Sequence, residues 1–350
     1  MSRYSPAILL VFPALWLLVA VGEAAAATKY VILHQWGGAP VSDVVRNVRR
    51  LESMPFDGTT VSIPASGTLM LGVPVGYEEM RRALAPMKGA FSRFTQNFVV
   101  IHTRRPPDVF DDWTTEIANW GNLARAARAA GLVGIFYDNE EYKEKTWLWP
   151  GDFRYPQRSL REYRDQMRLR GRQVMQAMVA EFPSIVVLTF HGPYVSDPHT
   201  PDGVTLSQAG ARAEDLRGAF FVGMVEGAGA RATVVDGGEC YQYRSTADFD
   251  QSYRWRKYDL ASARVNSVVI PPELRASWPG RVSVAFATYN KQWLRGYTMN
   301  PGTMRTCLIN ALRRSDKYVW VYVEDEWVKR DPPADWLAAV REGIGAGKAG

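Results

Sequence analysis

Thiols and imidazoles are scarce in this chain of 350 residues, which contains two cysteines and four histidines. With only Cys240 and Cys307, the chain cannot be a disulfide scaffold, and the sequence leaves open whether these two residues pair. The histidines do not show the His-x-His or His-Glu-x-x-His spacing of common metal enzymes. We therefore expect no cofactor and no bound metal.

Several loop motifs are also absent. The first predicted strand is followed by Trp36-Gly37-Gly38 rather than G-x-G-x-x-G, and there is no Walker-type loop, which argues against nucleotide binding. There is no G-x-S-x-G elbow, which argues against a serine hydrolase. The net charge is +6, but the basic residues are scattered, so we expect no nucleic-acid partner.

The first 27 residues have the pattern of a secretory signal. Arg3 gives a basic start, and the apolar stretch at 7–21 is shorter than the roughly 20 residues of a membrane span. Ala24–Ala27 offers a cleavage site for small residues. We predict a signal peptide at 1–27, a catalytic domain at 28–345 and a flexible tail at 346–350. The mature protein would be secreted or periplasmic, without a stable membrane anchor.

Strand-like and helix-like patterns alternate along the rest of the chain. The predicted strands are Tyr30–Gln35, Gly58–Pro64, Asn97–Thr103, Gly131–Tyr137, Ser184–His191, Ala232–Asp236, Arg281–Thr288 and Tyr318–Val323. The predicted helices are Val41–Met54, Glu78–Phe94, Trp113–Ala130, Ser159–Phe182, Thr205–Ala228, Asn300–Ser315 and Asp335–Ile344. This α/β alternation favours a single-domain (β/α)8 TIM barrel, with an open doubly wound sheet as the alternative.

The strand Gly131–Tyr137 ends abruptly in acidic residues. Side chains alternate along a strand, so Asp138 and Glu140 share one side. We expect Glu140 to be the general acid, because a neighbouring carboxylate and partial burial favour its protonated form. Asp138 would stay ionised and orient either the sugar or Glu140 itself. The second catalytic carboxylate stays open between Glu239 or Asp236 after the sixth strand and Glu324 after the eighth.

Other polar and aromatic side chains also follow the predicted strands. The active sites of α/β barrels lie at this end of the strands. Flat aromatic rings near a barrel mouth suit stacking on sugars. The substrate-binding candidates are His34, Trp36, His102, Tyr142, Trp149, His191, Tyr241, Asn290 and Trp327.

The stretch Gly134–Glu140, Gly-Ile-Phe-Tyr-Asp-Asn-Glu, resembles the fourth-strand signature of glycoside hydrolase family 18, which ends in Asp-x-Glu. In that family the Glu is the general acid and the Asp orients the acetamido group of the substrate. Asn139-Glu140 is also similar to the Asn-Glu pair of the large retaining-glycosidase clan. That clan has a nucleophilic Glu on strand seven, where this chain reads Ala287-Thr288-Tyr289-Asn290. A third clan pairs acids from strands four and six.

These resemblances imply a secreted TIM-barrel glycoside hydrolase that cleaves O-glycosidic bonds of a polysaccharide or oligosaccharide, although no one family pattern is complete. One alternative is a metal-dependent hydrolase or deacetylase, in which His34, His102 and His191 surround an ion with Asp138. The other alternative is a non-catalytic carbohydrate-binding barrel. The sequence does not indicate which sugar is recognised, or the oligomeric state.

Overall fold

The computed structural model describes residues 28–140, 146–205, 210–291 and 299–350. The predicted signal peptide at 1–27 and the candidate Tyr142 lie outside the described residues. Within the described ranges, no helix is both long and apolar enough to cross a membrane.

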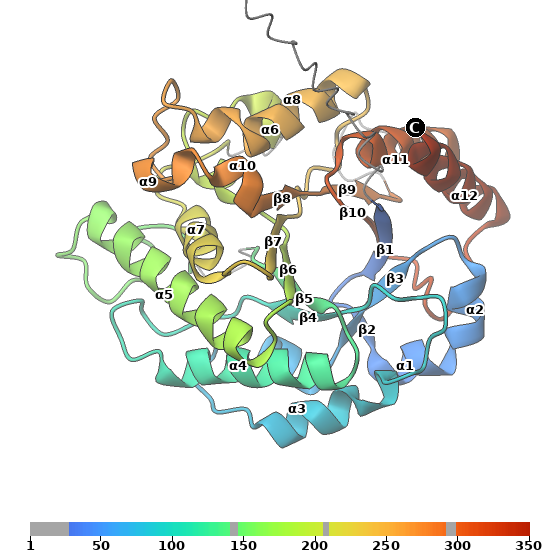
Figure 1. The fold of residues 1–350 in the computed structure, drawn as a ribbon, viewed down its shortest axis with the longest axis horizontal. Coiled ribbons are helices and arrows are strands. Elements are labelled where there is room, and N and C mark those ends of the chain that lie inside the picture. The colour runs from blue at the N-terminus through green and yellow to red at the C-terminus, as the bar shows by residue number, and fades with distance from the viewer. Residues whose placement is uncertain (1–27, 141–145, 206–209, 292–298) are drawn as a thin grey trace, which may run out of the picture.

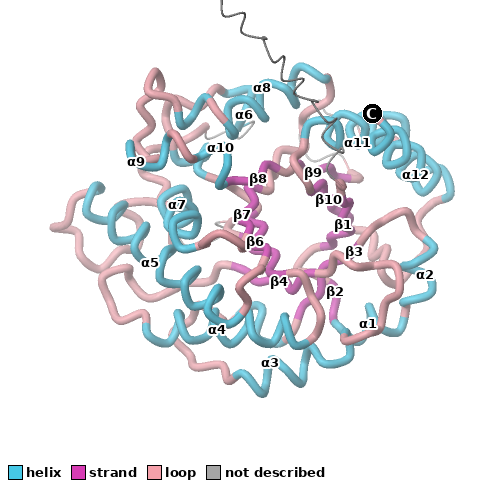
Figure 2. The backbone as a smooth tube through the Cα atoms, in the orientation of Figure 1, coloured by secondary structure: helices cyan, strands magenta, loops and turns pink. Residues whose placement is uncertain are grey.

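Parallel strands form a closed ring at the centre of the molecule (Figure 2). The strands are β1 (Tyr30–Gln35), β2 (Ala39–Pro40), β3 (Gly58–Ser62), β4 (Phe98–His102), β5 (Gly134–Asp138), β6 (Val186–Thr189), β7 (Thr233–Asp236), β8 (Val282–Val284), β9 (Phe286–Tyr289) and β10 (Tyr318–Val323). Their order is β8-β7-β6-β5-β4-β3-β1-β10-β9, with the short β2 beside β3.

The ring closes because β8 and β9 are two halves of one predicted strand. Only Ala285 separates them, and its N–H donates to the carbonyl oxygen of Asp236 on β7 at 2.8 Å. β8 pairs with β7, and β9 pairs with β10, which in turn pairs with β1. This closure confirms the predicted (β/α)8 barrel and rules out the open sheet.

Alternating side chains divide the core into two layers. Inward-pointing residues such as Ile32, Val100, Phe136 and Trp320 fill the ring, and the larger cluster lies between the strands and the helices. Because strand side chains alternate with a period of two, the last inward residue of each strand reaches the mouth of the barrel. This periodicity decides which polar residues can meet there.

Helices surround the ring on its outer side (Figure 1). They are α1 (Val41–Arg46), α2 (Val48–Ser53), α3 (Tyr77–Leu84), α4 (Thr114–Ala129), α5 (Leu160–Glu181), α6 (Asp202–Thr205), α7 (Arg217–Gly227), α8 (Thr246–Lys257), α9 (Pro272–Arg275), α10 (Trp278–Arg281), α11 (Pro301–Arg314) and α12 (Ala334–Ala349). Short 3₁₀ turns are η1 (Pro64–Gly67), η2 (Ala85–Met87), η3 (Pro193–Ser196) and η4 (Asp259–Ala261).

Most predicted helices are confirmed, but several boundaries were wrong. The helix expected to reach Phe94 ends its regular turns by η2, which contains Pro86. α7 begins only at Arg217, later than expected. The helices α8 to α10 were missed. α12 continues to Ala349, where we had expected a helix end at Ile344 and a loose tail.

A buried ion pair supports the strand closure next to the mouth. Arg256 of α8 donates from Nη1 to Asp236 Oδ1 at 2.9 Å and from Nη2 to the Ala285 carbonyl at 2.8 Å. Both side chains of the ion pair are 1% exposed. The Arg256 guanidinium therefore neutralises the Asp236 carboxylate at the end of β7. It also donates a hydrogen bond to the carbonyl of Ala285, the residue between β8 and β9.

We predict that Asp236→Asn costs about 3–5 kcal/mol of unfolding free energy, because it leaves the Arg256 charge buried without its partner. The matched control is Asp250→Asn, whose partner Arg314 is about as exposed as Asp250 itself, at 41% and 42%. The control should cost less than about 1 kcal/mol. Urea denaturation followed by tryptophan fluorescence measures both, and equal effects would contradict the structural role of Asp236.

Candidate active site

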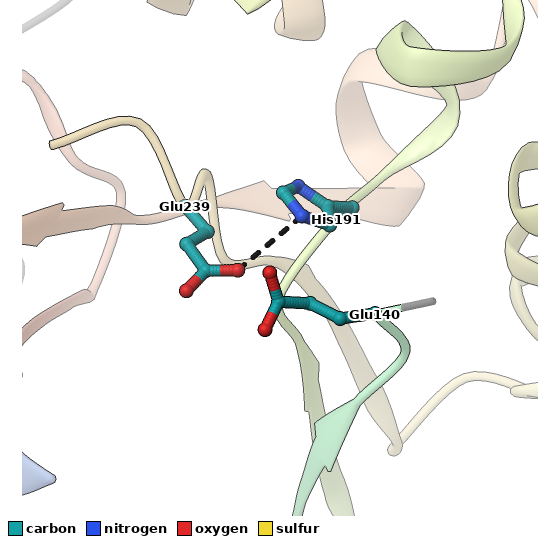
Figure 3. Close-up of side chains that lie close together, drawn as sticks. All are labelled: Glu140, His191 and Glu239. Carbon is teal, nitrogen blue, oxygen red and sulfur yellow. Dashed lines mark ion pairs between the residues drawn. The ribbon is translucent and has the colours of Figure 1, made fainter. Parts of the chain in front are cut away.

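Two glutamates and a histidine converge at the mouth of the barrel from three neighbouring strands (Figure 3). Glu140 follows β5, His191 follows β6 and Glu239 follows β7. One side-chain ligand atom from each residue lies within 4.8 Å of the others. Figure 3 shows the carboxyl groups of Glu140 and Glu239 turned toward each other, with His191 beside both.

Hydrogen bonds between the loops hold these three residues in place. Asn139 Nδ2 donates to the His191 carbonyl at 2.8 Å, and the His191 N–H donates back to Asn139 Oδ1 at 2.9 Å. The Glu239 N–H donates to the Phe190 carbonyl at 3.1 Å. The three loop ends thus form one connected unit, which limits how far the two carboxylates can separate.

Glu239 has a largely buried side chain, 9% exposed. The Tyr241 hydroxyl donates to Glu239 Oε1 at 2.6 Å, and His191 Nε2 lies 3.3 Å from Oε2. Burial raises the pKa of Glu239 well above its ordinary value, and the nearby charges of Glu140 and Asp138 raise it further. Glu239 is therefore suited to hold a proton near neutral pH.

His191 is a neutral neighbour of this acid pair. Burial lowers the pKa of His191 well below its ordinary value, and the charges of Arg217 and Arg256 lower it further. Its Nδ1 lies 3.0 Å from the Tyr194 hydroxyl, so the ring is oriented with Nε2 toward Glu239. A neutral, oriented imidazole can exchange a hydrogen bond with a carboxyl group or donate a lone pair to a metal ion.

Asp138 lies beneath Glu140 and supports it. Its Oδ1 accepts the Glu140 N–H at 3.0 Å, and its Oδ2 lies 2.9 Å from His102 Nδ1. The other nitrogen of His102, Nε2, lies 3.3 Å from the Gly37 carbonyl. His102 was predicted to bind substrate, but both of its nitrogens face groups of the protein.

Arg217 is a functional candidate that the sequence analysis missed. It begins α7 and forms hydrogen bonds from Nε to both carboxylate oxygens of Asp215, at 3.0 and 2.9 Å. The charge of Glu140 contributes to raising the pKa of this buried guanidinium. Arg217 therefore supplies positive potential on the Glu140 side of the pair, and no motif in the sequence linked the two.

Three tyrosines form an aromatic cluster beside Glu239. Tyr241 stacks on Tyr322 with ring centres 6.0 Å apart, and Tyr289 stacks on Tyr322 at 4.9 Å. Tyr322 was also missed. Its inward position could have been inferred from the sequence, because Tyr318, Trp320 and Tyr322 alternate along β10. The first two side chains fill the inner core.

The structure brings Asp138, Glu140, Glu239, His191 and Tyr241 together, with His102 tied to Asp138. Two candidate acids lie elsewhere. Asp236 follows the inward-pointing Val235, so it faces the outer layer and pairs with Arg256. Glu324 lies at the rim with a half-exposed side chain, 3.5 Å from Lys291 Nζ.

Several side chains that were predicted to bind substrate are buried or contact other groups of the protein. Trp327 is 1% exposed and belongs to the outer core, because the chain turns away from the mouth after β10. His34 is buried against Phe136, at 4.7 Å between ring centres, and its pKa is lowered to about 3 by burial. Asn290 donates to Asp325 at 2.7 Å. Trp149 is half-buried and packs on the outer core.

The two cysteines are separate buried thiols, so the open question of pairing is answered by the structure. Cys240 Sγ lies 3.2 Å from the Val204 carbonyl, and Cys307 Sγ lies 3.3 Å from the Tyr243 carbonyl. Neither thiol belongs to the acid cluster.

No family model and no curated protein matches the sequence. Among solved structures, the chain is similar to the catalytic domain of a hyperthermophilic chitinase from Pyrococcus furiosus, at 8% identity and a TM-score of 0.49, covering 91% of this chain and 96% of that one. It is also similar to a β-mannanase from the blue mussel Mytilus edulis, at 10% identity, a TM-score of 0.46 and coverage of 90% and 91%.

A third neighbour is the 3-keto-D-glucoside 4-epimerase YcjR from E. coli, at 13% identity, a TM-score of 0.42 and coverage of 91% and 98%. The neighbours thus include two hydrolases of carbohydrates and one epimerase. At these identities and scores the likeness carries no argument about activity. The strand ring establishes the barrel, and any function has to be argued from the site.

We predict that the elevated pKa of Glu239 depends on Glu140. In Glu140→Gln, the Glu239 pKa should fall toward its ordinary value of 4.5, because a neighbouring negative charge is removed. Carboxyl ¹³C NMR titration of glutamate-labelled protein measures this shift. Glu79→Gln, at an exposed position on α3, is the matched control. An unchanged pKa of Glu239 in Glu140→Gln would show that the two carboxyl groups do not interact.

Proposed function

We propose that this protein is a glycoside hydrolase in which Glu140 and Glu239 are the two catalytic carboxyl groups. The observation that carries the proposal is their convergence at the mouth of the barrel, within 4.8 Å and beside stacked tyrosines. Two carboxyl groups with different environments can divide acid and nucleophile roles on a neutral, hydroxyl-rich substrate. The substrate would be a carbohydrate.

The separation of the pair supports retention of anomeric configuration. Retaining enzymes hold the two carboxyl groups about 5–5.5 Å apart, whereas inverting enzymes leave roughly 6.5–9.5 Å for a water molecule. One oxygen of Glu140 and one of Glu239 lie within 4.8 Å of each other, which favours the shorter of these two separations. The hydrogen bonds through Asn139 that lock the loops oppose an opening of the gap.

The environments of the two acids support a division of roles that differs from the sequence-based expectation. Glu239 is enclosed and lies beside two other acids, so it would hold the shared proton and act as general acid. Glu140 lies near the positive charge of Arg217 and would be the nucleophile. We had expected Glu140 to be the acid.

The reaction would proceed in two steps. In the first, a Glu140 oxygen forms a bond to the anomeric carbon, the glycosidic C–O bond breaks, and the Glu239 proton moves to the leaving oxygen. In the second, the Glu239 carboxylate takes a proton from water, whose oxygen displaces Glu140 from the anomeric carbon. Asp138, bonded to the Glu140 N–H, would position the nucleophile.

We predict that Glu140→Gln and Glu239→Gln each lower hydrolysis by at least about a hundredfold while the fold is kept, because each removes one required proton or electron-pair transfer. The measurement is reducing-sugar release over a panel of bacterial and plant polysaccharides, with circular dichroism to confirm folding. Glu79→Gln is the control. Hydrolysis that survives in Glu140→Gln would contradict the mechanism, and sugar binding without hydrolysis by the wild type would favour a binding barrel.

One observation also favours a metal-dependent hydrolase as a second candidate. Glu140, His191 and Glu239 offer two carboxylate oxygens and an imidazole nitrogen within 4.8 Å. The contact between His191 Nδ1 and Tyr194 leaves Nε2 directed at the acids, as the outer partners of metal-binding histidines do. Such a set suits zinc or another divalent transition ion.

Metal binding separates the two candidates. If the carboxylates work as acid and nucleophile, zinc or manganese should raise the unfolding temperature of wild type no more than that of His191→Ala, and hydrolysis should persist in EDTA. A metal-specific increase that His191→Ala abolishes, with activity lost in EDTA, would favour the metal-dependent reading instead.

Secretion is a further part of the proposal, supported by the basic and apolar pattern of residues 1–27. Intact mass of the exported protein should correspond to cleavage near Ala26 or Ala27. A mass that includes Met1 would contradict it.

A further inference from the structure

Trp36 is the most exposed large hydrophobic side chain in the described part of the chain, at 72%. It directly follows β1, whose last residue Gln35 is in register with Val323 at the end of β10. Trp36 therefore stands on the same rim of the barrel as the acid pair. An indole exposed to this extent at the mouth of a barrel offers a flat aromatic face on which a sugar ring can stack.

The turn that carries Trp36 is held firmly in place. Gly37 and Gly38 have φ values of +70° and +74°, and the Gly38 N–H donates to the Gln35 carbonyl at 2.8 Å. A Cβ on Gly38 would lie 2.8 Å from a methyl group of Val100, so the backbone there touches the core. The sequence thus places an exposed ring on an immobilised turn.

His102 connects this turn to the acid pair. Its Nδ1 faces Asp138 Oδ2 at 2.9 Å, and its Nε2 faces the Gly37 carbonyl at 3.3 Å. A carboxylate and a carbonyl are both acceptors, whereas a neutral imidazole has only one N–H to donate. Both hydrogen bonds can exist together only when His102 is an imidazolium.

The charged groups around His102 favour that form. Burial opposes the charge and lowers the pKa of His102, but the hydrogen bond and charge of Asp138 and the Gly37 carbonyl outweigh it, so the pKa lies above its ordinary value of 6.5. Arg104, on the loop after β4, lowers it slightly. His34, on β1, is neutral at working pH.

A continuous path therefore runs from the Trp36 turn to the catalytic loop. It passes from the Gly37 carbonyl through His102 to Asp138, whose other oxygen accepts the Glu140 N–H at 3.0 Å. The path holds the backbone of the Trp36 turn in a fixed position relative to the backbone of Glu140. This arrangement would let one extended ligand contact both the Trp36 ring and the carboxyl pair.

We propose that Trp36 is the stacking platform of a second sugar-binding subsite, and that His102, as an imidazolium, is the positioning residue that fixes this platform relative to Glu140. The inference rests on the proposed function and deepens it. It makes the substrate a chain of sugars that spans the acid pair and Trp36, rather than one sugar joined to a small leaving group.

The first test compares Trp36→Ala with Tyr258→Ala, which removes another exposed aromatic ring, 49% exposed, next to the end of α8. The substrates are an oligosaccharide series of the sugar found in the release screen and a short aryl glycoside of the same sugar. Trp36→Ala should raise KM for the longer chains by about tenfold with kcat nearly unchanged. The aryl glycoside should be unaffected, as should both substrates in Tyr258→Ala.

The second test uses pH. The bond to Gly37 is present below the pKa of His102 and is lost as pH rises through it, so KM for long chains should rise over that range. In His102→Gln this pH dependence of KM should disappear. If His102 had only a structural role, its replacement would not remove the pH dependence of KM for the long chains alone. A change in KM on Trp36→Ala that is the same for the aryl glycoside and for the long chains, or an unchanged pH profile in His102→Gln, would overturn the proposal.

Binding measurements separate failure of this inference from failure of the proposed function. Calorimetry with the same oligosaccharides on Glu140→Gln and on Glu140→Gln/Trp36→Ala reads the subsite without catalysis. A weaker Kd for long chains in the double variant supports the subsite even if the wild type does not hydrolyse them. If the two variants have the same Kd at every chain length, the subsite is rejected, whether or not the wild type hydrolyses these sugars.

Discussion

Mutual repulsion among carboxylates at the mouth of the barrel is the constraint on which the rest of the site depends. Asp138, Glu140 and Glu239 lie close enough for the first two to raise the pKa of the third. Such a group is stable only if protons, hydrogen bonds or cations compensate the charge. Tyr241 donates to Glu239, His102 contacts Asp138, and the positive charge of Arg217 interacts with the charge of Glu140. The charge of the cluster is thus balanced by residues from several strands and loops.

The barrel supplies this compensation through its periodicity. Inward positions of β4, β5 and β10 bring His102, Asp138 and Tyr322 to the mouth, above an apolar interior. Outward positions serve stability, as Asp236 shows by pairing with Arg256 between β7 and α8. The residues of the proposed site and the stabilising ion pair therefore occupy alternate positions along the strands, and one step along a strand moves a side chain from one group to the other.

The sequence predicted the strands well because each is a short apolar run with a clear polar end, and the barrel followed from their number and spacing. It also placed Glu140, Asp138, Glu239 and His191 at those ends, where the structure brings the four side chains together. It could not separate Asp236 from Glu239, since the inward face of β7 is known only once Val235 is placed in the inner core. The charge interaction of Arg217 with Glu140 could not be predicted, because Arg217 begins a helix and Glu140 lies in a loop far away in the sequence. Trp327 was misassigned because exposure after a strand depends on where the loop turns.

Azide rescue shows whether Glu140 and Glu239 act as a pair on one anomeric centre. The measurement is the activity of Glu140→Ala and of Glu239→Ala in azide, with NMR identification of the glycosyl azide formed. A nucleophile variant and an acid variant should both be rescued and should give products of opposite anomeric configuration. We expect the inverted product from Glu140→Ala and the retained product from Glu239→Ala. Rescue of neither variant, on a substrate that the wild type hydrolyses, would contradict the proposed pair.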